Sequence, residues 1–225
     1  MNTFQERSSA LTGSACLEKA VDALHQDAPS TDVGYVKPVR TYRQVGEWQG
    51  VQVGDYSIAV AGDSGSAMTG ESGAALVGDR GTACAGMFGT AMAGEWGRAS
   101  AGEGGNASAL TCGVATAGRY GVATAGDYGT ATAEDFGAAS AGDFGIASVG
   151  INGTASAGVG GTVCAGELSE IRLKYWDEQA QRYRTVTGYI GENGLEPNAH
   201  YKLNDQHVLV RACLVDQVGR LRNGQ

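Results

Sequence analysis

The sequence predicts an all-β protein: a β-solenoid of about seven coils, each made of two octads, with a short N-terminal helix-containing segment and a small β-rich C-terminal cap. Fourteen octads, each a variant of GDYGTATA, follow one another from Gly54 to Ala165 without insertion or deletion. Their second halves alternate small residues with β-branched or hydroxyl residues, which is the period of a strand. Because a four-residue strand is not stable alone, successive octads must stack and pair.

The eight positions of the octad, called columns one to eight, differ in the residues that they tolerate. Column one is Gly in twelve octads and fails at Leu110 and Glu134. Column four is Gly in thirteen and fails at Ser57, and column six is Ala in thirteen and fails at Val163. We expect the two glycines to supply positive φ in a turn, and columns six and eight to face a narrow core. Columns five and seven then face outward.

Column two is usually acidic and column three favours aromatic residues. One octad is too short for a full circuit of a β-coil, so two octads form each coil and coils stack at about 4.8 Å. Column two then forms two rows of carboxylates, here called the first and the second edge. The first edge contains Asp63, Asp79, Glu95, Asp127 and Asp143. The second edge contains Asp55, Glu71, Glu103 and Asp135. Both rows are candidate partner-binding surfaces.

Column seven changes character along the chain. It carries Ser or Thr from Ser100 onward, apart from Cys164, but apolar or sulfur-containing side chains in the first five octads. The early residues are Val60, Met68, Leu76, Cys84 and Met92. An exposed apolar patch needs a cover. One candidate is an amphipathic helix in residues 14–26; the other is a homodimer contact over Val60, Met68, Leu76 and Met92.

The chain divides into three predicted regions. Residues 1–53 form an N-terminal helix and β-cap, residues 54–165 the octapeptide-repeat solenoid, and residues 166–225 a β-rich cap module. In the last region IRLKYW and RYRTVTGYI alternate around the polar turn DEQAQ, GENG is a turn and HVLVRACLV is a further strand.

Charge is concentrated in the repeat, where residues 54–165 carry ten acids and three bases. Direct binding of nucleic acid is disfavoured there, because phosphate contacts need a basic stripe. No apolar run reaches the roughly 20 residues of a membrane helix and no signal peptide precedes the repeat, so we expect no membrane contact and a cytoplasmic protein. The five scattered cysteines favour reduced thiols.

Several motifs in the chain resemble catalytic or metal sites. The string GDSGS at residues 62–66 resembles a serine-protease motif, but each of its residues is the ordinary occupant of its column or a common substitute. Calcium-binding β-rolls use nonapeptide repeats that place several carboxylates and carbonyls around one ion. This repeat has a period of eight and one acid per turn, so calcium binding is not expected. His200 and His207 are better explained as cap residues than as metal ligands. We therefore expect no catalytic residues, no metal and no cofactor, and a protein that is not an enzyme.

The octads, the transition AGVGGTVCAGE and the tail RYRTVTGYIGENGLEPNAHYKL together resemble octapeptide-repeat proteins of bacteria and their phages. This resemblance covers roughly residues 54–210 and implies a β-solenoid without a firmly assigned activity.

Three functions fit these expectations. The first is an acidic, DNA-mimic-like inhibitor of a basic nucleic-acid-handling host complex, in the manner of acidic pentapeptide-repeat rods. The second is a structural or assembly protein of a phage particle or oligomer. The third is ice binding, for which Thr130 and Thr132 are suited, although the predicted neighbouring coils read Val114/Thr116 and Ile146/Ser148.

Overall fold

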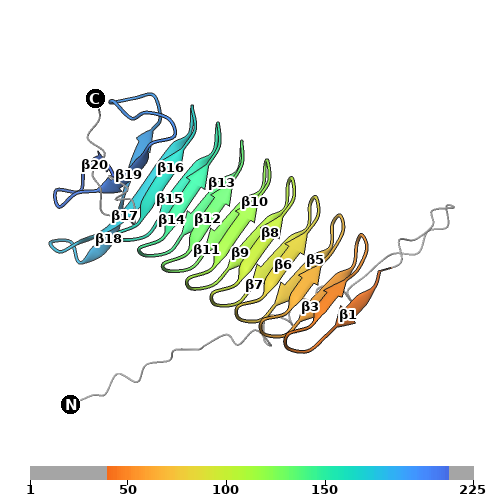
Figure 1. The fold of residues 1–225 in the computed structure, drawn as a ribbon. Coiled ribbons are helices and arrows are strands. Elements are labelled where there is room, and N and C mark those ends of the chain that lie inside the picture. Colours follow the sequence, from red (N-terminus) through yellow and green to blue (C-terminus); the bar gives the residue numbers. More distant parts are fainter. Residues whose placement is uncertain (1–39, 213–225) are drawn as a thin grey trace, which may run out of the picture. The chain divides into compact units, whose positions relative to one another are not determined.

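The structure is a computed structural model that describes residues 40–212, and all its regular elements are strands in two ten-stranded sheets (Figure 1). Sheet A contains, in spatial order, β1 (Tyr42–Gln44), β3 (Ile58–Ala61), β5 (Ala74–Val77), β7 (Thr90–Ala93), β9 (Asn106–Ala109), β11 (Val122–Ala125), β13 (Ala138–Ala141), β15 (Thr154–Ala157), β17 (Glu170–Asp177) and β18 (Arg182–Tyr189). Sheet B contains β2 (Gly50–Gln52), β4 (Ser66–Met68), β6 (Thr82–Ala85), β8 (Arg98–Ala101), β10 (Val114–Ala117), β12 (Thr130–Ala133), β14 (Ile146–Val149), β16 (Thr162–Ala165), β19 (His200–Leu203) and β20 (Leu209–Arg211).

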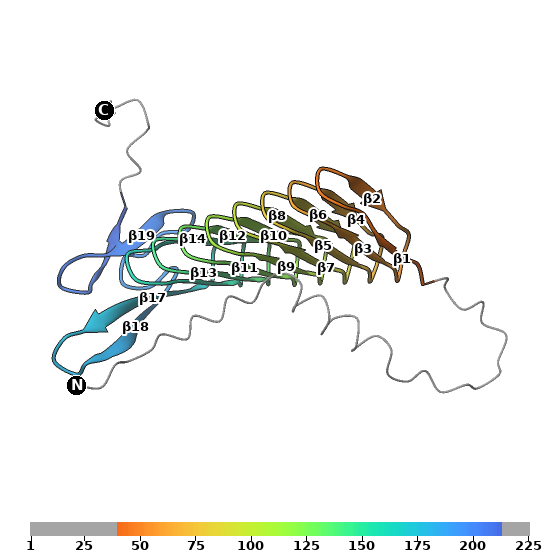
Figure 2. The same cartoon turned by 90° about the horizontal axis from the view of Figure 1, so that it is seen from below.

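The two sheets belong to one β-solenoid in which each coil is made of two octads, as predicted. From β1 to β17, odd-numbered strands pair in parallel with odd-numbered ones and even-numbered strands with even-numbered ones. Val114 lies opposite Thr130 in register, for example. Figure 2 shows successive coils joining the two sheets through short turns at both edges. The helix predicted within residues 14–26 lies outside the described residues.

The solenoid extends one octad further at each end than the sequence analysis predicted. Gly50 pairs with Ser66 at the beginning and Thr154 with Glu170 at the end, so the coils run from residue 46 to residue 173 and number eight rather than seven. The added octads were missed because Val51 and Ile171 occupy column six, where the other octads are nearly uniform in alanine. The strands β1 and β2 confirm the β-structure expected before Gly54.

The core consists of a double row of alanine side chains between the sheets. Ala115, Ala123 and Ala131 in column six are all 0% exposed, and column eight is buried throughout the repeat except at the half-buried Thr69 and Val77. This confirms the inward assignment of columns six and eight. Larger side chains fill the core toward its C-terminal end, where Val163 and Ile171 are also 0% exposed. The core is therefore wider at the C-terminal end of the solenoid, where it holds Val and Ile side chains, than in the middle coils, where it holds only alanine methyl groups.

The turn between strands differs from the predicted one in where its unusual backbone lies. A hydrogen bond from the column-four N–H to the column-one carbonyl closes it, as from Gly129 to Gly126 at 3.1 Å. Positive φ falls on column three, at Tyr128 (57°) for example, and not on the two glycines. This is the arrangement of a type II turn, whose third residue requires positive φ. The assignment of positive φ to columns one and four was therefore wrong.

The glycines in columns one and four are needed for close backbone approach. A Cβ at Gly129 would lie 2.8 Å from the Cβ of Ala125 and 2.9 Å from the carbonyl oxygen of Gly113 on the preceding coil. A side chain at such a position in column four would therefore clash with the backbone. It fits where its own polar atom can take part in the hydrogen bonds of the turn. Ser57 meets this condition: its Oγ donates to the carbonyl of Asp55 at 2.9 Å and accepts the N–H of Thr41 at 3.1 Å.

The C-terminal cap ends the parallel pairing with two antiparallel hairpins. The long strands β17 and β18 pair along their whole length, and β19 pairs antiparallel with β16 before β20 adds to it. The strands around DEQAQ and the GENG turn are as predicted, whereas β19 was missed. Both sheets run without interruption through the boundaries drawn at residues 53 and 165. None of the residues 40–212 belongs to a helix that is long and apolar enough to span a membrane.

Candidate functional site: the two turn edges

Every aspartate of column two forms the same hydrogen bond to the next coil. Its Oδ1 accepts the backbone N–H of the column-two residue one coil later, as in the bond from Asp79 N–H to Asp63 Oδ1 at 2.9 Å. The six aspartates that do so are Asp55, Asp63, Asp79, Asp127, Asp135 and Asp143. Glutamates in the same column make no such bond within residues 40–212. Aspartate thus has a structural role here that sequence reasoning missed.

The aspartate in column two also explains the glycine in column one. A Cβ at Gly142 would lie 2.6 Å from the backbone nitrogen of Asp127 and would collide with its Oδ1. All six aspartates are followed by glycine in column one of the next coil. The two exceptions to glycine in column one, Leu110 and Glu134, follow Glu95 and Arg119 instead. The two side chains that column one accepts thus both stand where the preceding coil lacks the aspartate, although backbone atoms crowd this column in the other coils too.

This coupling is testable with Asp127 and Gly142. Gly142→Ala is expected to destabilise the fold by about 1–3 kcal/mol through overpacking, and Asp127→Ala by about 1 kcal/mol through loss of the amide bond. Because removing the Asp127 side chain removes one of the three close contacts that a Cβ at Gly142 would make, the double variant should be more stable than the sum of the single effects by about 1 kcal/mol. Urea unfolding of the four proteins measures this, and strict additivity would contradict the coupling.

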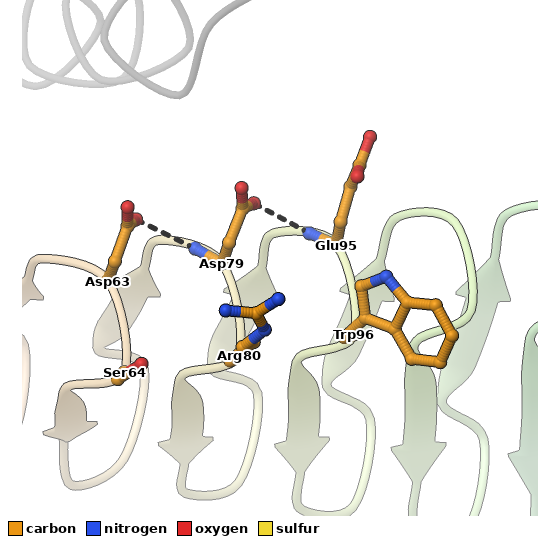
Figure 3. A pocket seen from close by; sticks show the side chains of 6 residues that line it. All are labelled: Asp63, Ser64, Asp79, Arg80, Glu95 and Trp96. Carbon is orange, nitrogen blue, oxygen red and sulfur yellow. Dashed lines mark hydrogen bonds between the residues drawn. The ribbon is translucent and has the colours of Figure 1, made fainter.

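The first edge brings three of its predicted residues together on consecutive coils. Asp63, Asp79 and Glu95 stand in a row, and the second oxygens of the two aspartates point away from the coil (Figure 3). Thr111 then interrupts the row before Asp127 and Asp143. The row borders a shallow hollow of about 190 Å³, lined by Asp63, Ser64, Asp79, Arg80, Glu95 and Trp96.

The second edge is more broken than the first. Asp55 and Glu71 are neighbours, but Met87 separates them from Glu103, and Arg119 separates Glu103 from Asp135. The Arg119 guanidinium lies 5.5 Å from the ring centre of Tyr120 and 5.7 Å from that of Phe136. A cation in the middle of this row reduces its attraction for a basic partner.

The aromatic residues of column three stand beside the carboxylates. Tyr128 stacks on Phe144 on the first edge with ring centres 5.2 Å apart, and Tyr120 stacks on Phe136 on the second at 5.1 Å. Trp96 and Tyr128 are each 63% exposed. The first edge therefore presents exposed aromatic faces next to carboxylates, a combination that suits guanidinium and ammonium groups.

The apolar residues predicted in column seven do not form one patch. Val60, Leu76 and Met92 are adjacent on sheet A, whereas Met68 lies on sheet B with Cys84 as its neighbour in register. The separation follows from two octads per coil, because alternate octads belong to opposite sheets. Val60 and Leu76 are only 4% and 6% exposed although their column faces outward, and Met68 is 44% exposed.

The outward faces of the sheets lack a regular threonine array. Thr130 lies between Val114 and Ile146 in register, and Thr132 between Thr116 and Ser148, as the sequence predicted. An ice-binding surface with threonine in both outward columns of successive coils is therefore interrupted on each side of β12.

The cysteines and histidines of the described part of the chain are dispersed. Cys84, Cys112 and Cys164 form no disulfide, and burial raises the pKa of the Cys164 thiol, partly offset by a hydrogen bond with Ser148. No group of three or more His, Cys, Asp or Glu side chains within residues 40–212 is arranged to hold a metal ion.

The two histidines lie in the cap. His207 stacks on Tyr175 with ring centres 3.8 Å apart, and His200 begins β19 with a buried Nδ1 that has no hydrogen-bond partner among residues 40–212. Arg184 pairs with Asp177 at the end of the β17–β18 hairpin. The pKa of the Asp177 carboxyl is lowered first by the hydrogen bond from Ala180 N–H and then by Arg184.

Comparison of the chain with protein-family profiles, with curated protein sequences and with solved structures gives no match.

Proposed function

We propose that this protein is a non-enzymatic binding rod whose first edge captures a basic, nucleic-acid-handling protein complex. The observation that carries the proposal is the row formed by Asp63, Asp79 and Glu95. One oxygen of each aspartate accepts a backbone N–H, and the other points to solvent without an intramolecular partner in the described chain. The fold thus fixes the two aspartate carboxylates in position and leaves their charge available.

The electrostatics of the row favour a partner with several cations. Two charges about 4.8 Å apart repel by about 1 kcal/mol in water, and the amide hydrogen bonds offset this cost within the fold. Arg80 lies in the same hollow, but it forms no ion pair with a residue of the described chain. A basic partner would relieve the repulsion, and its arginine side chains would stack on the exposed face of Trp96.

The charge spacing along the first edge supports an extended contact with a basic partner. Counted from residue 46, column two of this edge carries six acids in eight coils, and those in consecutive coils lie about 4.8 Å apart, at the spacing of neighbouring strands. A DNA strand carries one phosphate per about 3.4 Å, so the edge presents a sparser row of charge of the same sign. The resemblance to octapeptide-repeat proteins of phages is the ground for the biological setting that we propose, inhibition of a host nuclease or immune complex in the cytoplasm.

The charge proposal is tested by replacing Asp63, Asp79, Asp127 and Asp143 together with asparagine. Because asparagine keeps an Oδ1 acceptor, the backbone bonds and the circular dichroism spectrum should persist, while capture of the partner from host extract is lost. The captured protein is identified by mass spectrometry, and duplex DNA should displace it from the parent protein.

The matched control replaces Asp55 and Asp135 on the second edge with asparagine, and it should retain capture. Undiminished capture by the fourfold first-edge variant would contradict the proposal. If a partner is captured but duplex DNA does not displace it, the first edge is a binding surface but does not imitate DNA.

A structural role in an assembly is the second candidate, and the exposed apolar side chain of Met68 on sheet B, which has Cys84 as its neighbour in register, favours it. Light scattering of the purified protein distinguishes the two candidates. An assembly element associates with itself at micromolar concentration, whereas an inhibitor requires only its partner.

A further inference from the structure

The described part of the chain contains two Asn-Gly pairs, Asn152-Gly153 and Asn193-Gly194, in different surroundings. Asparagine followed by glycine is the pair in which the next backbone nitrogen most easily reaches the side-chain carbonyl, because glycine offers no steric hindrance. Asparagine is for this reason among the thermolabile residues of proteins. Because the same dipeptide occurs in two structural settings, the effect of the fold on the reactivity of asparagine can be separated from the effect of the local sequence.

We infer that Asn193 is a site of spontaneous deamidation in the native protein and that the fold protects Asn152. In this reaction the backbone nitrogen of Gly194 loses its proton and bonds to Cγ of Asn193. The Cγ–Nδ2 bond breaks, ammonia leaves and a five-membered succinimide forms. Water then opens the ring at either carbonyl, which gives aspartate or isoaspartate without any change of oxidation state.

The turn around Asn193 leaves the attacking nitrogen free. The N–H of Leu195 donates to the carbonyl of Glu192 at 2.9 Å, and Asn193 and Gly194 between them have φ of 50° and 77°. This is a type I′ turn, in which the third residue's N–H points away from the turn. Within residues 40–212 the Gly194 N–H donates no hydrogen bond, and no atom beyond the glycine and its two chain neighbours lies within 4 Å of the position its Cβ would occupy.

The corresponding nitrogen of Gly153 is held by the next octad on the same edge. Its N–H donates to Ser169 Oγ at 3.0 Å, and that serine is 1% exposed. The Asn152 N–H donates to the carbonyl of Glu167 at 2.9 Å. Both peptide groups next to Asn152 are thus fixed by the stacked coil, so ring closure requires local opening of the solenoid.

Conversion of Asn193 would change the cap both electrically and sterically. A new carboxylate would stand beside Glu192, and isoaspartate would lengthen the backbone within a tight turn. That turn positions Leu195, which is 9% exposed and packs in the cap core. The product is therefore expected to hold Leu195 less firmly.

The test incubates the whole protein at mildly alkaline pH, in buffer and in urea, and follows both sites by peptide mapping and enzymatic methylation of isoaspartate. In buffer, Asn193 should convert at least about ten times faster than Asn152, since protection requires local opening. In urea the two deamidation rates should become similar. Such a result would show that the difference in buffer comes from the fold and not from the local sequence.

Three variants complete the test. Asn193→Gln should remove the product at this position, Gly194→Ala should slow it, and Ser169→Ala should speed conversion of Asn152 by releasing the Gly153 N–H. Equal native rates at the two sites would overturn the inference. So would an Asn193 that stays intact in buffer but converts in urea.

Discussion

Ala131→Leu is expected to lower the melting temperature of the protein substantially. Ala131 is 0% exposed and lies in register between Ala115 and Ala147, in a core built from methyl groups. Short turns join the two sheets at both edges, so the sheets cannot separate locally to admit the larger side chain. Overpacking costs about 1–3 kcal/mol in ordinary cores, and we expect the upper end here. That corresponds to a fall of about 5–10 °C, measured by circular dichroism.

The matched control for Ala131→Leu is Thr132→Leu, the next residue along β12. Its side chain faces outward and is half-buried, so the same added volume meets solvent. The control should melt within about 2 °C of the parent. If Ala131→Leu melts as the control does, the core is wider than the alanine packing indicates.

Leu76→Asp is expected to have the second large effect. Leu76 points outward from β5 between Val60 and Met92, yet it is 6% exposed. A carboxylate there would be desolvated without a cation beside it, which costs about 3 kcal/mol or more unless the surrounding contact opens. We therefore expect a marked loss of stability, which thermal melting measures, and parallel light scattering shows whether association changes as well.

Ser140→Asp provides the comparison for Leu76→Asp, because Ser140 occupies the same column of sheet A on β13 and is exposed. This variant should leave both melting and association unchanged. A Leu76→Asp protein that matches the parent in both measurements would show that the buried position is not needed for fold or assembly.

The coil and its inward columns could be predicted from the sequence because they depend on side-chain size alone. Column six is nearly uniform in alanine, and only a narrow two-sheet core explains that uniformity. The turn could not be predicted from composition, because glycine suits both positive φ and close approach. One signal was present: column three contains Gly104, Asn152 and Gly160, and glycine and asparagine are the residues that best tolerate positive φ.

The acidic edges were predicted as rows, but their structural role was not. Aspartate and glutamate carry the same charge, so a charge count cannot distinguish them, whereas only the shorter side chain forms the bond to the next coil. The pairing of each aspartate with a glycine in column one of the next coil was visible in the sequence. The exceptions at Leu110 and Glu134 pointed to the same contact. The octad at each end was missed because Val51 and Ile171 enlarge the core there.

The alternation of octads between two sheets restricts how a gene for this chain can change length. Since β17 continues sheet A and β19 joins sheet B, the cap fits only after an even number of octads. Duplication or loss of one octad would move every later strand to the opposite sheet and exchange the two edges. Duplication or loss of two adjacent octads would leave each face and the cap in place. Recombination between repeats should therefore yield folded descendants only in steps of whole coils.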